Sequence, residues 1–196
     1  MLLVPLCVFV FGLCATESAA QHSKPHQDST ETYKMTLKML RRSATLRLLM
    51  YSPEIRNKTP ECLISHFIKR KSDRVRRTLE TNSKSTERQG IKLNTTVSIF
   101  VRNRRHPYLQ VLSKEDPLRR LWSDAQYLEY AEPKECFILK AAYHDEPRPP
   151  CVLWGYKCTF KCQRRFVEVC GRGRPVDLRD CTQTEKEKDQ KISQCR

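Results

Sequence analysis

The stretch from Cys151 to Cys181 reads CVLWGYKCTFKCQRRFVEVCGRGRPVDLRDC and holds five of the ten cysteines of the chain. Its first part, 151–156, is an apolar run typical of a buried strand. In its second part Cys162, Phe166, Val169 and Cys170 share one face of a helix, and Gly171 follows where many helices end. We interpret the stretch as the last strand of a sheet, followed by a helix that disulfides hold against the outside of that sheet. A self-contained cysteine knot is the alternative, but the apolar alternation upstream needs a partner layer.

The first twenty residues have the features of a secretory signal peptide. An apolar run over 2–15 is too short to span a bilayer, and Ser18-Ala19-Ala20 forms a small-residue cleavage site, although no Lys or Arg precedes the run. No later stretch is apolar enough to span a membrane. We therefore expect a signal peptide at 1–20, one secreted domain at 21–181, and a charged tail at 182–196 that Cys195 ties down.

The cysteine count indicates disulfides. Cys7 and Cys14 leave with the signal peptide, and an even number of cysteines remains for an oxidising compartment. The remaining cysteines are Cys62, Cys136, Cys151, Cys158, Cys162, Cys170, Cys181 and Cys195. The spacing of Cys158 and Cys162 is not that of a C-x-x-C pair and no histidine cluster lies near, so we expect no metal and no cofactor.

The net charge of +15 favours anionic partners such as sulfated glycans, acidic proteins or carboxylate ligands. Nucleic acid fits the charge, but a secreted destination argues against it. Short arginine clusters lie at 74–77, 102–106, 119–120, 164–165 and 172–174, and together they are candidates for a polyanion surface. The alternative is a solvated basic surface that only aids solubility.

Period-two alternation predicts a series of short strands. The clearest spans Ile91 to Arg102, with Thr95, Val97 and Ile99 on its buried face and Phe100 as the exception on the wet face. The sequons at Asn94, on that wet face, and at Asn57, in a loop, predict N-glycosylation. The other predicted strands cover 45–51, 62–69, 74–80, 108–112, 125–131, 135–143 and 151–156, after a short helix over 33–40 that plugs one end.

Eight short strands with a helix at each end favour an all-β, eight-stranded antiparallel barrel with the C-terminal helix packed on its wall. Such a barrel has room for about one small ligand. A sandwich is the second choice, because it does not explain the late helix.

Several of these residues resemble the C-terminal signature of the tick salivary lipocalins, the histamine-binding-protein family. The resemblance rests on Cys151-x-Leu-Trp154, on the helix Cys162-x-x-x-Phe166-x-x-x-Cys170-Gly171, and on Asp180-Cys181. Weaker matches upstream are Leu48 to Ser52, Glu61 to Leu63, and Tyr127 to Cys136. Tyr33 stands where the family usually has Trp, and Cys158 and Cys195 are additions. The resemblance implies a monomeric lipocalin barrel that is not an enzyme.

The resemblance also implies a disulfide pattern. It pairs Cys62 with Cys181 and Cys136 with Cys162. The simplest completion then pairs Cys151 with Cys170 and Cys158 with Cys195.

The family's range implies a secreted scavenger of a small host mediator, either an anionic lipid such as a leukotriene or an amine such as histamine. An anionic lipid needs one inward cation. The best candidate is Arg77, flanked on its predicted face by Val75 and Leu79. The second is His66, which shares a predicted face with Cys62, Ile64 and Ile68. An amine needs carboxylates and aromatic faces, for which Glu129, between Tyr127 and Ala131 on one predicted strand face, is the best candidate. Trp154 completes the ligand-binding set. For each charged candidate the alternative is a structural or solvated role.

The positive net charge of the chain favours the anionic lipid, with Arg77 as the partner of its carboxylate. The rival hypothesis is an outer surface that inhibits a complement, chemokine or clotting protein, or that binds glycosaminoglycan. No histidine has a recognisable nucleophile motif around it, so catalysis is not expected.

Overall fold

A computed structural model describes residues 28–60, 62–72, 74–82, 94–113, 125–142, 149–181 and 195. The expected signal peptide, and the expected tail apart from Cys195, lie outside the described residues. Within them, no helix is long and apolar enough to cross a membrane.

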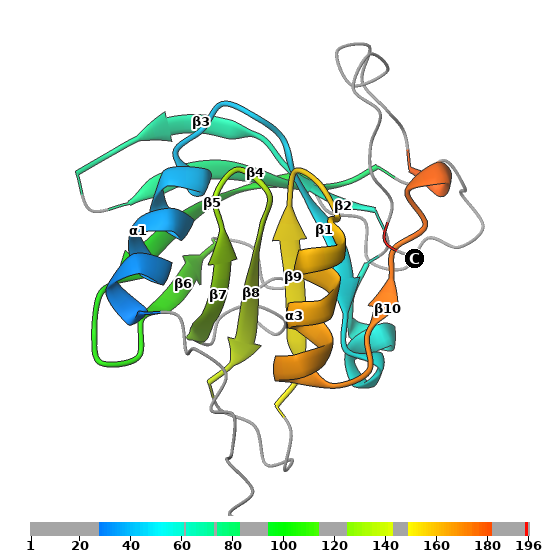
Figure 1. Ribbon diagram of the computed structural model, residues 1–196. Coiled ribbons are helices and arrows are strands. Elements are labelled where there is room, and N and C mark those ends of the chain that lie inside the picture. Colours follow the sequence, from blue (N-terminus) through cyan, green and yellow to red (C-terminus); the bar gives the residue numbers. More distant parts are fainter. Residues whose placement is uncertain are drawn as a thin grey trace, which may run out of the picture.

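The described chain folds into ten strands and two α-helices, with two short 3-10 helices (Figure 1). The strands are β1 (Leu46–Tyr51), β2 (Leu63–Ser65), β3 (Phe67–Arg70), β4 (Val75–Thr81), β5 (Asn94–Arg102), β6 (Tyr108–Leu112), β7 (Gln126–Glu132), β8 (Cys136–Ala141), β9 (Cys151–Gly155) and β10 (Arg174–Pro175). The helices are α1 (Ser29–Leu40) and α3 (Phe160–Cys170), with 3-10 turns η1 (Pro53–Lys58) and η2 (Leu178–Asp180).

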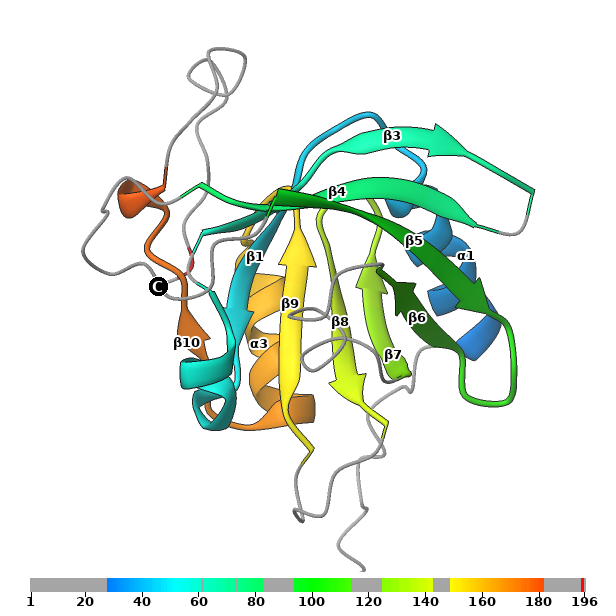
Figure 2. The same ribbon diagram turned by 180° about the vertical axis from the view of Figure 1, so that it is seen from behind.

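The sheet closes on itself. Each strand from β4 to β9 pairs antiparallel with the next, and β9 returns to pair with β1. β2 and β3 both pair with β4, so they act as one strand interrupted at His66, while β10 pairs with the end of β1 at Met50 and Tyr51. Figure 2 shows β1, β9, β8 and β7 side by side in the wall. The expected eight-stranded antiparallel barrel is confirmed.

The barrel is closed and filled from the inward face of each strand. On β5 the inward residues Thr95, Val97 and Ile99 are buried, while Asn94 and Thr96 are exposed. This matches the alternation in the sequence from Asn94 onward, and residues 91–93 lie outside the described part of the chain. Burial of these aliphatic side chains is the main favourable contribution to folding.

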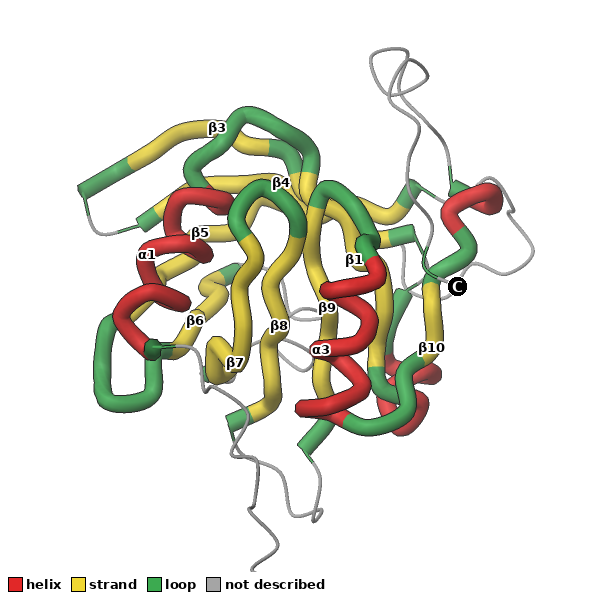
Figure 3. The backbone as a smooth tube through the Cα atoms, in the orientation of Figure 1, coloured by secondary structure: helices red, strands yellow, loops and turns green. Residues whose placement is uncertain are grey.

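The late helix α3 packs on the outer wall formed by β7, β8 and β9, as Figures 1 and 3 show. The Thr159 hydroxyl caps its first turn by accepting from the Cys162 N–H, and Gly171 ends it at a φ of 80° that disfavours other residues. Cys162 and Phe166 are fully buried against the wall, whereas Val169 and Cys170 are half-buried. The predicted helix is confirmed, with Val169 at the edge of its buried face.

Four disulfides join Cys62 to Cys181, Cys136 to Cys162, Cys151 to Cys170 and Cys158 to Cys195, in the predicted pairing. The second and third bridges tie the two ends of α3 to β8 and β9. The first and fourth tie the chain beyond α3 back to β2 and to the start of the helix. Bridges that close long loops typically contribute about 2–4 kcal/mol each.

Gly155, at the end of β9, is the position where the wall admits no side chain. A Cβ atom there would lie 2.2 Å from the Glu135 carbonyl oxygen and 2.9 Å from the Cys136 Cα. We expect Gly155→Ala to lower the free energy of unfolding by about 1–3 kcal/mol, because backbone rather than a flexible side chain must move. Urea unfolding with intact disulfides measures this, and Ser98→Ala on the outer face is the control. Equal stability of the two variants contradicts this close packing.

Candidate functional site

A small apolar cavity lies inside the barrel. It is lined by Leu40, Leu46, Ser65, Leu79, Val97, Ile99, Leu109, Val111, Phe137, Leu139 and Trp154. Apart from the Ser65 hydroxyl, the described lining side chains carry no polar group but the Trp154 indole N–H. The volume is about 40 Å³, which is room for about three water molecules. An apolar ligand group therefore fits the chemistry of this interior.

Arg77 lies inside the barrel at the end where α1 finishes, and it is fully buried. Its Nε donates to the Ser65 hydroxyl at 3.0 Å, and its two terminal nitrogens donate to four backbone carbonyls. These belong to Leu40 (2.9 Å), Arg42 (3.0 Å), Ala44 (2.9 Å) and Ser65 (2.7 Å). All five guanidinium N–H groups are thus used by the protein.

This arrangement corrects the role expected for Arg77. The sequence places the side chain inside the barrel, and the structure agrees. However, no N–H donor remains for the carboxylate of a ligand. The role of Arg77 is therefore structural: it links β4 to β2 and to the segment between α1 and β1. The C-terminal carbonyls of a helix lack partners within the helix, and Arg77 supplies a donor to the last carbonyl of α1, that of Leu40, together with positive charge at the negative end of the helix dipole.

Tyr156 completes this closed end. Its hydroxyl donates to the Met39 carbonyl at 2.6 Å, and the Arg42 guanidinium lies 5.3 Å from the centre of its ring. Burial lowers the pKa of Arg77 to about 10, which leaves it charged at neutral pH. Burial also raises the pKa of the Tyr156 hydroxyl, against the opposing effect of Arg77 and Arg42, so Tyr156 stays neutral and can donate.

Three other predicted ligand-binding residues do not line the cavity. None of His66, Tyr127 and Glu129 is among the described residues that line it. The His66 Nδ1 lies 3.1 Å from the Thr45 hydroxyl, at the break between β2 and β3. In that segment Ser65 lines the cavity, so the inward face is the one opposite to Cys62, Ile64 and His66. The predicted ligand contact of His66 does not fit this geometry.

For Glu129 the physical reason is a β-bulge. The pairing of β7 with β8 shifts register between Leu128 and Tyr130, so the alternation changes phase at Glu129. The predicted continuous face of Tyr127, Glu129 and Ala131 therefore does not exist. The Glu129 carboxylate instead lies 3.9 Å from the Lys140 amine, while Tyr127 makes an edge contact with His106.

Trp154 is the one predicted ligand-binding residue that lines the cavity. The cross-strand partner of Trp154 is Phe137 on β8, which also lines it. The other aliphatic lining residues were missed as site residues, although the alternation on β4 and β5 already marks Leu79, Val97 and Ile99 as inward.

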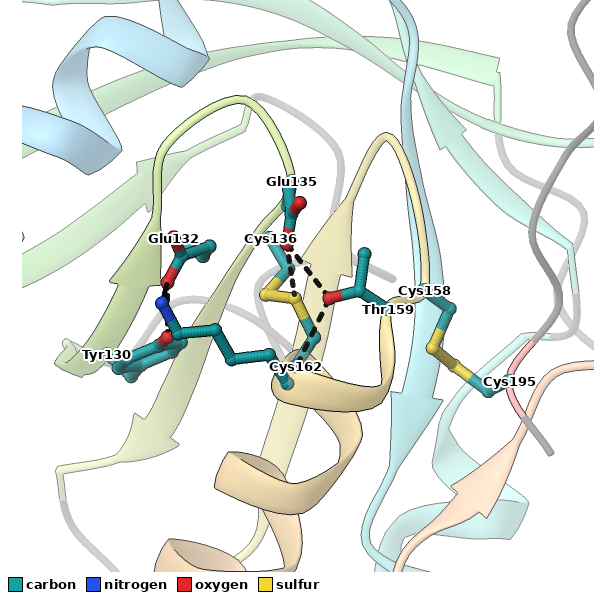
Figure 4. The surroundings of a disulfide bond; sticks show 9 residues. Tyr130, Glu132, Glu135, Cys136, Cys158, Thr159, Cys162 and Cys195 are labelled. Carbon is teal, nitrogen blue, oxygen red and sulfur yellow. Dashed lines mark hydrogen bonds and ion pairs between the residues drawn. A yellow bond between two sulfur atoms is a disulfide. The ribbon is translucent and has the colours of Figure 1, made fainter.

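A polar cluster joins α3 to the outer wall beside the Cys136–Cys162 disulfide (Figure 4). The Glu135 carboxylate accepts from the Thr159 hydroxyl at 2.9 Å, and Glu132 pairs with Lys161 at 2.6 Å. The Tyr130 hydroxyl donates to Glu132 at 2.5 Å. Burial acts to raise the pKa of Glu132, but the bonds from Lys161 and Tyr130 outweigh it and lower that pKa. The cluster fastens the helix and lies outside the cavity.

No family model and no curated protein sequence matches the chain. Among solved structures, the chain is similar to japanin from Rhipicephalus appendiculatus bound to cholesterol, a tick salivary lipocalin. The identity is 18%, the TM-score is 0.58, and the match covers 72% of this chain and 97% of japanin.

Two crustacyanins also match. Apocrustacyanin C2 has 6% identity and a TM-score of 0.51, covering 81% of this chain and 87% of that one. Lobster apocrustacyanin A1 has 7% identity and a TM-score of 0.52, covering 76% and 84%. These likenesses show that the fold is that of the lipocalins, as the resemblance in the sequence implied.

Removing the hydrogen bonds of the Arg77 guanidinium tests its structural role. We expect Arg77→Met to lower the free energy of unfolding by about 3–5 kcal/mol, because the buried Leu40 and Ser65 carbonyls and the Ser65 hydroxyl lose a charged donor. Arg76→Met, on the neighbouring outward position, is the matched control and should change it by less than about 0.5 kcal/mol. Urea unfolding of both variants is the measurement. Equal midpoints contradict the assignment.

Proposed function

We propose that this lipocalin is a secreted, non-enzymatic carrier that sequesters a small lipophilic molecule inside its barrel. The observation that carries the proposal is the apolar cavity within the closed sheet, lined by Leu79, Ile99, Phe137 and Trp154 among others. The fold it shares with japanin, a protein whose structure contains cholesterol, supports the same class of ligand. Four disulfides support an oxidising, extracellular location.

The lining favours a lipid over a biogenic amine. A protonated amine in a dry interior requires a carboxylate partner, and no acidic side chain is among the described lining residues. Glu129, the best acidic candidate, pairs with Lys140 instead. A leukotriene-like acid remains compatible only if its carboxylate lies outside the apolar lining, because the donors of Arg77 are already used.

The cavity is too small to hold a whole lipid unless the side chains that line it move. Pockets that enclose small molecules usually measure roughly 300–1,000 Å³, whereas this cavity measures about 40 Å³. A sterol-sized or eicosanoid-sized ligand therefore requires the lining side chains to change rotamer and open the interior. The rival proposal, a filled barrel that inhibits a host protein through its outer surface, is favoured by the same small volume.

Calorimetric titration with cholesterol, leukotriene, histamine and serotonin separates these proposals. We expect saturable binding of a lipid and none of the amines. Val97→Phe, which fills the cavity from β5, should weaken lipid binding at least tenfold, which is about 1.4 kcal/mol. Thr96→Phe, on the exposed side of the same strand, is the control and should leave the affinity within about twofold. Lipid binding that both variants retain equally contradicts a site inside the barrel, and binding of no ligand in the panel favours the rival.

Secretion predicts glycosylation. The side chains of Asn57, in η1, and Asn94, at the start of β5, are both exposed. We expect protein secreted from insect cells to lose mass on glycosidase treatment, and each Asn→Gln variant to remove one glycan. An unchanged mass after treatment contradicts occupancy of both sequons.

A further inference from the structure

On the outside of the barrel, two arginine guanidinium groups lie over the ring of one aromatic side chain. Phe100 is the residue that breaks the polar pattern on the outward side of β5, yet it is only 7% exposed. The Arg74 guanidinium lies 5.5 Å from the centre of its ring, and that of Arg102 lies 5.2 Å away. Cation–π contacts of this kind hold guanidinium groups in place on a surface.

More cations lie on the same face. Cross-strand partners share a face of the sheet, and Arg76 is paired with Lys69 on one side and with Ser98 on the other. Lys71 donates its backbone N–H to the Arg74 carbonyl in the turn between β3 and β4. We define the outer basic face as Lys69, Lys71, Arg74, Arg76 and Arg102, which come from three neighbouring strands and the turn between two of them.

Among the described residues, little negative charge offsets these cations. At the described outward positions of β4, β5 and β6, Glu80 is the one acidic residue. It lies four residues from Arg76, which is about 13 Å along the strand. Within the described chain, Lys69, Lys71, Arg76 and Arg102 form no ion pair.

The other side of the molecule differs. There Arg164 and Arg165 both pair with Glu168, Lys161 pairs with Glu132, and Arg179 pairs with Asp177. The arginine clusters in the sequence are therefore not one surface. Ion pairs offset part of the charge around α3, and Arg77 is buried, whereas on the outer basic face Lys69, Lys71, Arg76 and Arg102 have no ion pair within the described residues.

A shallow depression of about 550 Å³ lies on this face. It is lined by Lys71, Arg74, Arg76, Thr95, Thr96, Ser98, Leu112 and Ser113. Cations and hydroxyl groups together are suited to a ligand that carries both anionic groups and sugar hydroxyls. Positions on this face repeat about every 4.8 Å across strands and about 6.6 Å along them, which places several cations within reach of one linear polyanion.

We propose that the outer basic face is a binding site for a sulfated polysaccharide, separate from the barrel interior. A secreted protein meets such chains outside the cell, whereas nucleic acid is not an expected partner there. Among the described residues that line the depression, Leu112 is the single exposed large apolar side chain, which is too little for insertion into a membrane. The site does not depend on a ligand in the cavity.

Heparin affinity with matched charge variants tests the proposal. Arg76→Gln/Arg102→Gln removes two charges from the outer basic face. Arg172→Gln/Arg174→Gln removes the same charge from exposed positions beyond α3 and is the control. Losing the contacts of two arginines with heparin sulfate groups should weaken heparin binding about tenfold at physiological salt. The slope of log affinity against log salt concentration should fall in magnitude by about two. The control should lose less than about twofold, and desulfated heparin should not bind.

Equal weakening in the two double variants overturns the proposal, because heparin retention then reflects only the net charge of the chain. Binding of anionic phospholipid vesicles through Arg76 and Arg102, without retention on heparin, also overturns it and assigns the face to membranes. Unchanged thermal unfolding of both double variants is the check that the fold is intact. Lipid binding inside the barrel is measured on the same variants and should not change, so failure of either proposal is seen separately.

Discussion

The Arg77 guanidinium holds together the end of the barrel on which the interior depends. It joins β4 to the Ser65 position of β2 and to the backbone carbonyls of Leu40, Arg42 and Ala44, where α1 turns into β1. The Leu40 carbonyl is buried, and without the Arg77 donor it would be a buried acceptor at the end of α1, which costs free energy. The guanidinium keeps its charge, but it offers no free N–H donor to the cavity. A charged residue inside the barrel thus produces an apolar site, because all of its hydrogen-bonding capacity is spent on the protein.

The sulfur bridges act on the outside of the same wall. Cys136–Cys162 and Cys151–Cys170 fasten both ends of α3, and the Glu135–Thr159 and Glu132–Lys161 contacts reinforce the first of these positions. Polar and sulfur contacts therefore lie on the outer face of β8 and β9, while Phe137 and Trp154 point inward. This division lets the helix be held firmly without placing a polar group in the cavity. It also leaves the lining free to consist of aliphatic and aromatic side chains that can repack around a ligand.

Much of the fold follows from periodicity in the sequence, whereas the site follows only in part. Alternation on β5 and the spacing of Cys162, Phe166 and Cys170 predict a strand and a helix face because burial enforces both periods. The bulge at Glu129 and the break at His66 have no comparable signal, so the faces predicted for those strands are wrong. Arg77 shows a different limit: its neighbours Val75 and Leu79 indicate that it is buried, but its partners are backbone carbonyls, which leave no pattern in the sequence. Phe100 breaks the alternation, and in the structure the Arg74 and Arg102 guanidinium groups lie over its ring.

The structure therefore separates an apolar interior from a basic exterior, and the central claim is that a lipophilic ligand occupies the interior. Methyl-labelled NMR during titration with the lipid that binds tests this claim most directly. The account predicts that the methyl resonances of Leu79, Val97, Ile99 and Leu109 shift with the ligand, while those of Ile68 and Val167, exposed on the outside, do not. Shifts confined to the exterior methyl groups, with the interior resonances unchanged at saturation, would contradict it.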